Sequence, residues 1–135
     1  MRRVHALITV AAVAGGLAGC SATPPSSAGD FKGAERDVAQ VVDDMQKAGR
    51  TGKPDKLCND IFTASLAEKF KAGSETCVDE VEKAMRDVND YDIKVDDITI
   101  TGNTATAKVT QGKEKRGGTI GFERTGNSWR VSSIS

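Results

Sequence analysis

The chain has 135 residues, with 19 basic and 19 acidic side chains and a formal net charge of zero. A surface that binds nucleic acid needs clustered Lys and Arg and usually a basic balance, so the charge argues against a nucleic-acid partner. The one dense basic run, residues 113–116, is typical of a solvated hairpin loop; a contact with headgroups or polyanions is the alternative. A chain of this length buries one core, so we expect a single domain.

The N-terminus carries the signals of an export segment. Arg2, Arg3 and His5 form a short basic start, and an apolar stretch follows over residues 6–17. This stretch is too short to span a bilayer, which takes about 20 apolar residues. We therefore predict a signal peptide over residues 1–19, which is removed on export and takes no part in the fold.

The end of this segment, Leu17-Ala18-Gly19-Cys20, resembles the lipobox at which bacterial lipoprotein precursors are lipidated and cleaved. In that family the cysteine thiol accepts diacylglycerol, and cleavage leaves the cysteine as the first residue. The resemblance implies that Cys20 anchors the protein in the cell membrane, on the extracytoplasmic face, because two acyl chains hold stably. The alternative is an ordinary signal peptide that happens to contain a cysteine.

The two other cysteines, Cys58 and Cys77, form an even pair in a chain that we expect to be exported, and disulfides persist outside the cytoplasm. We predict a disulfide between them. A redox or metal pair is the alternative, but the spacing is far from Cys-x-x-Cys, and the single histidine, His5, lies in the predicted signal peptide. We expect no cofactor and no metal.

After Cys20 the composition changes twice. We predict that residues 20–30 comprise the lipidated cysteine and a flexible tether. The tether is predicted because segments rich in Ser, Pro, Ala and Gly bury too little apolar area to fold. Order is expected to begin near Asp30, with one domain over residues 31–135. Its first element is an amphipathic helix over residues 35–48, since apolar residues recur at helical spacing. That apolar stripe consists of Val38, Val41, Val42 and Met45.

Three short helical segments are predicted next. Residues 53–62 form a helical turn opened by Pro54, which buries Leu57, Cys58, Ile61 and Phe62. Residues 63–72 form a short helix. A third helix starts at Ser74 or Thr76 and runs through Val88, whose side chain is expected on the inner face; Thr76 and Asp79 have the spacing of a capping box.

From Tyr91 onward the apolar period changes to two, which indicates strands. Tyr91, Ile93 and Val95 alternate on one parity and Ile98 and Ile100 on the other, so a bulge at Asp96-Asp97 is needed if all face one core. Turns at Gly102-Asn103 and Gly126-Asn127 and a looser connection over residues 112–118 separate the strands that follow. The prediction is a four-stranded antiparallel meander with strands at 104–111 and 119–124 and a last strand holding Trp129 and Val131.

Helices followed by a meander define an α+β domain with the helices on one face of the sheet. This order, the hairpin at Gly102-Asn103-Thr104-Ala105 and the closing Gly126-Asn127-Ser128-Trp129-Arg130-Val131 strand resemble the nuclear transport factor 2-like (cystatin-like) superfamily. More closely, the chain is similar to small actinobacterial lipoproteins of that fold, whose disulfide the cysteine pair also resembles. The resemblance covers about residues 30–135 and implies a sheet curved into a cone, here with a shallow hollow.

Fold alone does not decide function, because this fold carries enzymes as well as binding modules. The isomerases and dehydratases that it resembles use an Asp or an Asp-His pair inside the cone. The candidate pocket residues here are Asp97 as acid or base, Tyr91 as hydrogen-bond donor, and Trp129. We expect Asp97 and the nearby aspartates to lie on a solvated edge, and Trp129, Phe122 and Phe70 to lie in the core.

These observations favour a non-enzymatic envelope lipoprotein, bound to the membrane through Cys20. Its domain is expected to bind a small apolar ligand or another envelope protein. The alternative is a small-molecule isomerase or dehydratase that uses a pocket Asp or Tyr.

Overall fold

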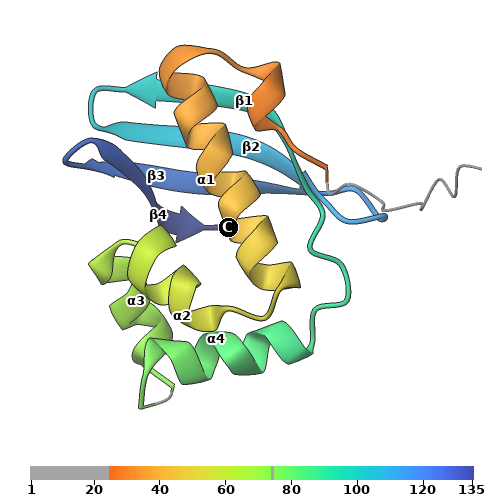
Figure 1. Cartoon of the computed structure of the whole chain (residues 1–135), viewed down its shortest axis with the longest axis vertical. Coiled ribbons are helices and arrows are strands. Elements are labelled where there is room, and N and C mark those ends of the chain that lie inside the picture. Colours follow the sequence, from red (N-terminus) through yellow and green to blue (C-terminus); the bar gives the residue numbers. More distant parts are fainter. Residues whose placement is uncertain (1–24, 74) are drawn as a thin grey trace, which may run out of the picture.

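The computed structural model describes residues 25–73 and 75–135, and these form helices and one antiparallel sheet. Figure 1 shows the arrangement, which confirms the predicted α+β class. The predicted lipobox and signal peptide lie outside the described residues. In chain order the elements are η1 (a 3-10 turn, Ala28–Asp30), α1 (Gly33–Arg50), α2 (Pro54–Lys56), η2 (a π-helical turn, Leu57–Ile61), α3 (Ala64–Lys71), α4 (Cys77–Arg86), β1 (Ile93–Thr101), β2 (Thr104–Gln111), β3 (Arg116–Thr125) and β4 (Ser128–Ile134).

The sheet is a meander in the order β1-β2-β3-β4, as predicted. Its first pairing contains the predicted bulge. Val95 pairs with Val109 and Asp97 with Lys108, so Asp96 is the extra residue on β1. The bulge changes the parity of the strand, which is why Val95 and Ile98 are both buried although they lie three positions apart along the chain.

The connection between β2 and β3 differs from the prediction. We expected a loose connection over residues 112–118, but β3 already begins at Arg116. Gly112 and Lys115 adopt positive φ angles of 68° and 52° and close a tight turn between the strands. Glycine is rare in strands, which is why the Gly-rich run was assigned to a loop. A side chain at Gly118 would be crowded in the sheet, since a Cβ there would lie 3.1 Å from the Ser135 carbonyl oxygen.

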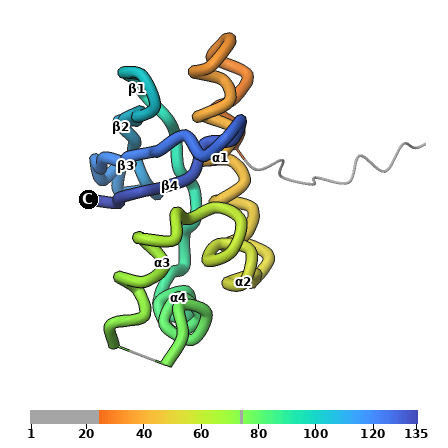
Figure 2. Tube along the Cα trace, turned by 90° about the vertical axis from the view of Figure 1, so that its left-hand side faces the viewer, coloured from red at the N-terminus to blue at the C-terminus, as the bar shows by residue number. Residues whose placement is uncertain are grey.

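Helix α1 crosses one face of the sheet, as the two views in Figures 1 and 2 show. The core between them contains Phe122, which is 1% exposed, and Val38 and Val42, which are completely buried. The predicted stripe is rotated slightly, because Val41 and Met45 are only half-buried. The buried face of α1 consists of Val38, Ala39, Val42, Gln46, Ala48 and Gly49.

The short helices α2, α3 and α4 gather at one end of the molecule (Figure 2). The predicted disulfide is present: Cys58 in η2 is bonded to Cys77 at the start of α4, with Cα atoms 6.1 Å apart. The predicted cap of α4 is confirmed too, because the Thr76 hydroxyl accepts a hydrogen bond from the Asp79 amide at 3.1 Å. The expectation for Val88 is wrong: α4 ends at Arg86, and Val88 is exposed.

Each edge of the sheet is contacted by another part of the chain over part of its length. At β4, the Thr63 amide donates to the Val131 carbonyl at 2.8 Å. At β1, the Val95 amide donates to the Ser27 hydroxyl at 2.9 Å, and the Ile93 amide donates to the Gln46 side-chain oxygen at 2.6 Å. Backbone groups of an edge strand that are bonded within the chain are not free to pair with another chain, so these contacts limit association at the start of β1 and the middle of β4.

Candidate functional site

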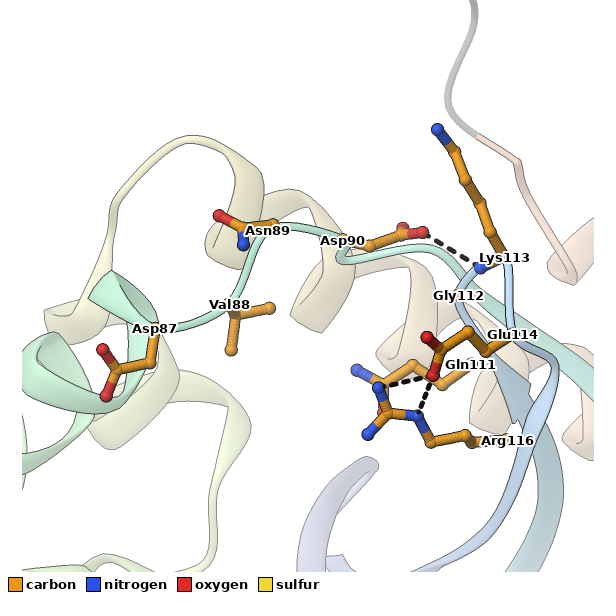
Figure 3. A pocket seen from close by; sticks show the side chains of 9 residues that line it. All are labelled: Asp87, Val88, Asn89, Asp90, Gln111, Gly112, Lys113, Glu114 and Arg116. Atoms are coloured by element: carbon orange, nitrogen blue, oxygen red, sulfur yellow. Dashed lines mark hydrogen bonds and ion pairs between the residues drawn. The ribbon is translucent and has the colours of Figure 1, made fainter.

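A hollow of about 420 Å³ lies between the connection that follows α4 and the β2–β3 turn (Figure 3). Its lining is polar and carries charges of both signs, with amide side chains between them. The residues that line it are Asp87, Val88, Asn89, Asp90, Gln111, Gly112, Lys113, Glu114 and Arg116.

The Asp90 carboxylate joins the two walls of this hollow. One oxygen accepts a hydrogen bond from the Asp92 amide at 2.9 Å, and the other accepts from the Lys113 amide at 3.1 Å. The Gly112 amide donates to the Asp92 carbonyl at 2.8 Å and completes the link. Both Asp90 oxygens thus accept hydrogen bonds from the backbone, so this residue shapes the hollow.

The opposite wall carries an ion pair between Arg116 and Glu114. The Arg116 Nε and Nη2 atoms lie 3.0 and 2.8 Å from one Glu114 oxygen. Both side chains are exposed, so the pair is weak and can open toward another charged group. The Lys113 side chain extends away from this pair (Figure 3). The hollow can therefore contact a polar group of either charge.

The three candidate pocket residues from the sequence do not meet in one place. Asp97 is exposed on β1, beside the bulge. The Tyr91 hydroxyl donates to the Met85 carbonyl at 2.7 Å, and its ring packs on Gly49, where an added Cβ would lie 2.6 Å from the ring. Trp129 is 6% exposed on β4, with the Arg124 guanidinium 5.7 Å from its ring centre.

The aromatic side chains that could line a ligand cavity are packed into the core. Phe122 and Trp129 are buried, and the half-buried Phe70 stacks on Phe62 with ring centres 5.3 Å apart. The prediction that Phe122 and Trp129 are core residues is confirmed. In the described part of the chain, the buried polar side chains are Ser27, Gln46 and Thr63, none of which is ionisable.

Sequence reasoning missed a cluster of polar contacts that holds the start of the domain. The half-buried Asp43 carboxylate accepts hydrogen bonds from the Ser27 and Ala28 amides at 2.9 and 3.1 Å and from the Ser26 hydroxyl at 2.7 Å. The Gln46 amide group donates to the Pro25 carbonyl at 2.7 Å. We name Asp43 and Gln46, with the residues 25–28 that they hold, the N-terminal clamp.

The clamp corrects the expected start of order. We predicted a flexible spacer through Gly29 and order from about Asp30, but Ser27 and Ala28 are buried and η1 begins at Ala28. The composition of residues 25–29 suggested a spacer because such side chains bury little apolar area; in the structure hydrogen bonds hold residues 25–28, and Ala28 also packs into the core. The available signal was Gln46, a polar residue four positions after Val42 on the buried face of α1.

Asp96, the extra residue of the bulge, is the one carboxyl group whose pKa clearly departs from its ordinary value among the described residues. The Thr110 hydroxyl donates to it at 2.5 Å, and this bond, with a smaller contribution from the Lys94 ammonium at 3.5 Å, lowers the pKa of Asp96. The group is exposed, so the shift reflects a surface contact and no buried acid.

Comparisons with protein-family models, with curated proteins and with solved structures each found no match. Within residues 25–73 and 75–135, no helix has both the length and the apolar character needed to cross a membrane. The same residues contain no group of three or more His, Cys, Asp or Glu side chains placed to hold a metal ion. Cys20 lies outside this part of the chain.

Proposed function

We propose that the protein is an envelope lipoprotein, anchored through diacylglycerol on Cys20 after removal of residues 1–19, with its domain on the extracytoplasmic face of the cell membrane. The lipobox-like sequence at the end of the apolar run supports this proposal. The disulfide adds support, because it uses Cys58 and Cys77, and Cys20 is the third cysteine of the chain. Disulfides persist in the compartment to which such a protein is exported.

We further propose that the domain has the cystatin-like architecture of the nuclear transport factor 2-like superfamily. Helix α1 on one face of a four-stranded meander, with a bulge that bends β1, supports this assignment. The face of the sheet that α1 covers is filled by Val38, Val42 and Phe122. A filled face suits contacts on the outside of the domain better than a ligand inside it.

The function that we propose for the domain is non-enzymatic binding of another envelope protein. One observation carries this choice over an apolar ligand: Trp129 and Phe122, the aromatics suited to line a ligand cavity, are closed in the core at 6% and 1% exposure. The polar hollow of Figure 3 is the proposed contact surface. Its exposed Glu114–Arg116 pair can exchange for charges on a protein segment at little cost.

The anchor is tested by fractionation and by labelling with a radioactive fatty acid. Cys20→Ala should leave the membrane fraction, or accumulate as uncleaved precursor, and should lose the label, whereas the nearby Thr23→Ala variant should behave like the parent. Label that persists in Cys20→Ala would overturn the assignment of the lipidation site.

The contact surface is tested by a photo-crosslinking amino acid at Asn89, which lines the hollow, with Thr125 at the end of β3 as the matched exposed control. In intact envelopes, position 89 should form a discrete protein adduct that position 125 does not. The adduct should weaken when Arg116→Glu reverses one charge of the hollow. Identical adducts at both positions would overturn the proposed surface.

An apolar ligand is tested by titrating the protein with a fluorescent apolar dye while the emission of Trp129, the single tryptophan, is followed. No saturable change is expected, because the Trp129 ring is packed against core side chains. Saturable binding at one site would instead favour a ligand carrier.

A further inference from the structure

The clamp determines where the chain leaves the domain toward its N-terminus. Asp43 receives three hydrogen bonds from residues 26–28, and Gln46 holds the Pro25 carbonyl. Ser27 is also tied to β1, because its hydroxyl accepts the Val95 amide at 2.9 Å. The exit point is thus attached to both α1 and the edge of the sheet, and it cannot shift relative to the domain.

The distance from this exit point to Cys20 is short. Four residues separate Cys20 from Pro25, so even a fully extended chain spans at most about 18 Å. The headgroup layer takes up about 5–7 Å of that length. A domain of about 105 residues has a radius of gyration of about 13 Å and hence a diameter of about 34 Å. The surface around Pro25 therefore stays within a fraction of a domain diameter of the headgroups.

The surface around Pro25 has a defined composition. It borders a shallow hollow formed by the start of β1 and the β2–β3 turn, with Lys94, Gly112 and Lys115 among its residues. Its acids have partners inside the molecule: Asp92 pairs with Arg50, and Asp96 contacts both Thr110 and Lys94. We call this region the exit face.

Two lysines of the turn beside the exit face remain available. Lys113 and Lys115 are exposed, and within the described part of the chain neither ammonium group has an ion-pair or hydrogen-bond partner. Basic side chains close to a membrane are attracted to anionic headgroups, and the attraction fades within about one Debye length. The short connection to Cys20 limits Pro25 to about 11–13 Å above the headgroups, a height comparable with the Debye length of about 8–10 Å, so these lysines can come within its reach.

We propose that the exit face, with Lys94, Lys113 and Lys115, rests on the lipid headgroups, and that the clamp and the short connection to Cys20 impose this orientation. The proposal depends on the lipid anchor at Cys20 proposed above. Helix α3, which packs beside β4 at the opposite edge of the sheet from β1, then points away from the bilayer (Figure 1). The polar hollow, which shares Gly112 with the exit face, opens close to the membrane surface.

The test uses the lipidated full-length protein in vesicles of zwitterionic lipid with a minor anionic component and a spin label on some headgroups. A fluorophore is attached to Lys113→Cys on the turn or to Lys69→Cys on α3; both are exposed lysines in the parent. Position 113 should be quenched severalfold more strongly than position 69. Equal quenching at the two positions in protein that still sediments with the vesicles would overturn the orientation.

Failure of the anchor gives a different result. Protein that stays in the supernatant, with neither position quenched, would show that Cys20 does not hold it, which removes the basis of the proposal together with the proposed function. Circular dichroism and disulfide mapping of both labelled variants confirm that the fold and the Cys58–Cys77 bond are retained.

A second variant tests the cause of the orientation. Inserting about ten Gly and Ser residues between Thr23 and Pro24 raises the maximum reach by about 30 Å and leaves the domain unchanged. Quenching at position 113 should fall toward that at position 69, while sedimentation stays complete. Undiminished quenching after the insertion would overturn the role assigned to the short connection.

Discussion

The two ends of the molecule are stabilised in different ways. Between α1 and the sheet, Val38, Val42, Phe122 and Val131 are at most 1% exposed. In α3 and α4 the buried residues are Leu66 and Val81, one in each helix. Short helices that bury so little apolar area are only marginally stable alone. The Cys58–Cys77 bond therefore stabilises that end of the molecule covalently. The comparison teaches that this small domain combines a packed core with a covalent link where the core is thin.

The packed end is tested most severely by Phe122→Ala. This change removes the largest fully buried side chain and should lower the free energy of unfolding by about 4 kcal/mol. Urea unfolding followed by Trp129 fluorescence measures it, with the exposed Thr125→Ala variant on the same strand as control. A loss below about 1 kcal/mol would contradict a core centred on Phe122.

The covalent end is tested by replacing both Cys58 and Cys77 with Ser. Opening a loop of 19 residues should cost about 3 kcal/mol in the chain-entropy model. Hydrogen exchange should then rise first in α3 and α4, while β2 and β3 keep their protection. If all elements lost protection together, the two ends would not differ in how they are stabilised, which would contradict the comparison.

The clamp combines both kinds of stabilisation, because hydrogen bonds hold residues 25–28 while Ala28 packs into the core. Asp43→Ala removes three of them and should cost about 2 kcal/mol. The matched control is Asp44→Ala on the same helix, whose half-buried side chain accepts one long bond from Gln40 at 3.3 Å. Exchange of the Ser27 and Ala28 amides reports the effect directly, and amides that stay protected in Asp43→Ala would contradict the clamp.

The smallest effect is expected at the bulge. The Thr110 hydroxyl lowers the pKa of Asp96, so the stabilising contact is present above about pH 4, the ordinary range of the group, and is lost as pH falls through the lower folded-state value. Thr110→Val should raise the pKa of Asp96 toward its ordinary value, as measured by NMR titration of its carboxyl carbon. An unchanged titration midpoint would show that Thr110 is not the cause.

Much of the fold could be predicted because local patterns reported it directly. The change from helical to alternating period separated the helices from the sheet, and the switch of parity between Val95 and Ile98 located the bulge at Asp96-Asp97; the structure assigns the extra residue to Asp96. Counting cysteines paired Cys58 with Cys77. The Gly-rich start of β3 was missed, because glycine favours loops by local propensity and its place in the sheet depends on the approach of Ser135.

The candidate site was less accessible to such reasoning. The sequence suggested Tyr91, Asp97 and Trp129 as pocket residues, but they lie in three separate places. Tyr91 contacts α4 through the Met85 carbonyl, Asp97 is exposed beside the bulge of β1, and Trp129 is buried on β4. The hollow itself joins residues 87–90 with residues 111–116, which only the pairing of β1 with β2 brings together.

By itself, the sequence determined the elements, their order, the disulfide pair and the expectation of an anchor at Cys20, because each depends on composition or on spacing along the chain. Only the tertiary structure decided that residues 25–28 belong to the domain, because the carboxylate of Asp43 and the amide of Gln46 come from a helix that begins several residues later. That long-range contact leaves four residues between Cys20 and Pro25. In the proposed anchored form, it also defines which face of the domain would lie toward the bilayer.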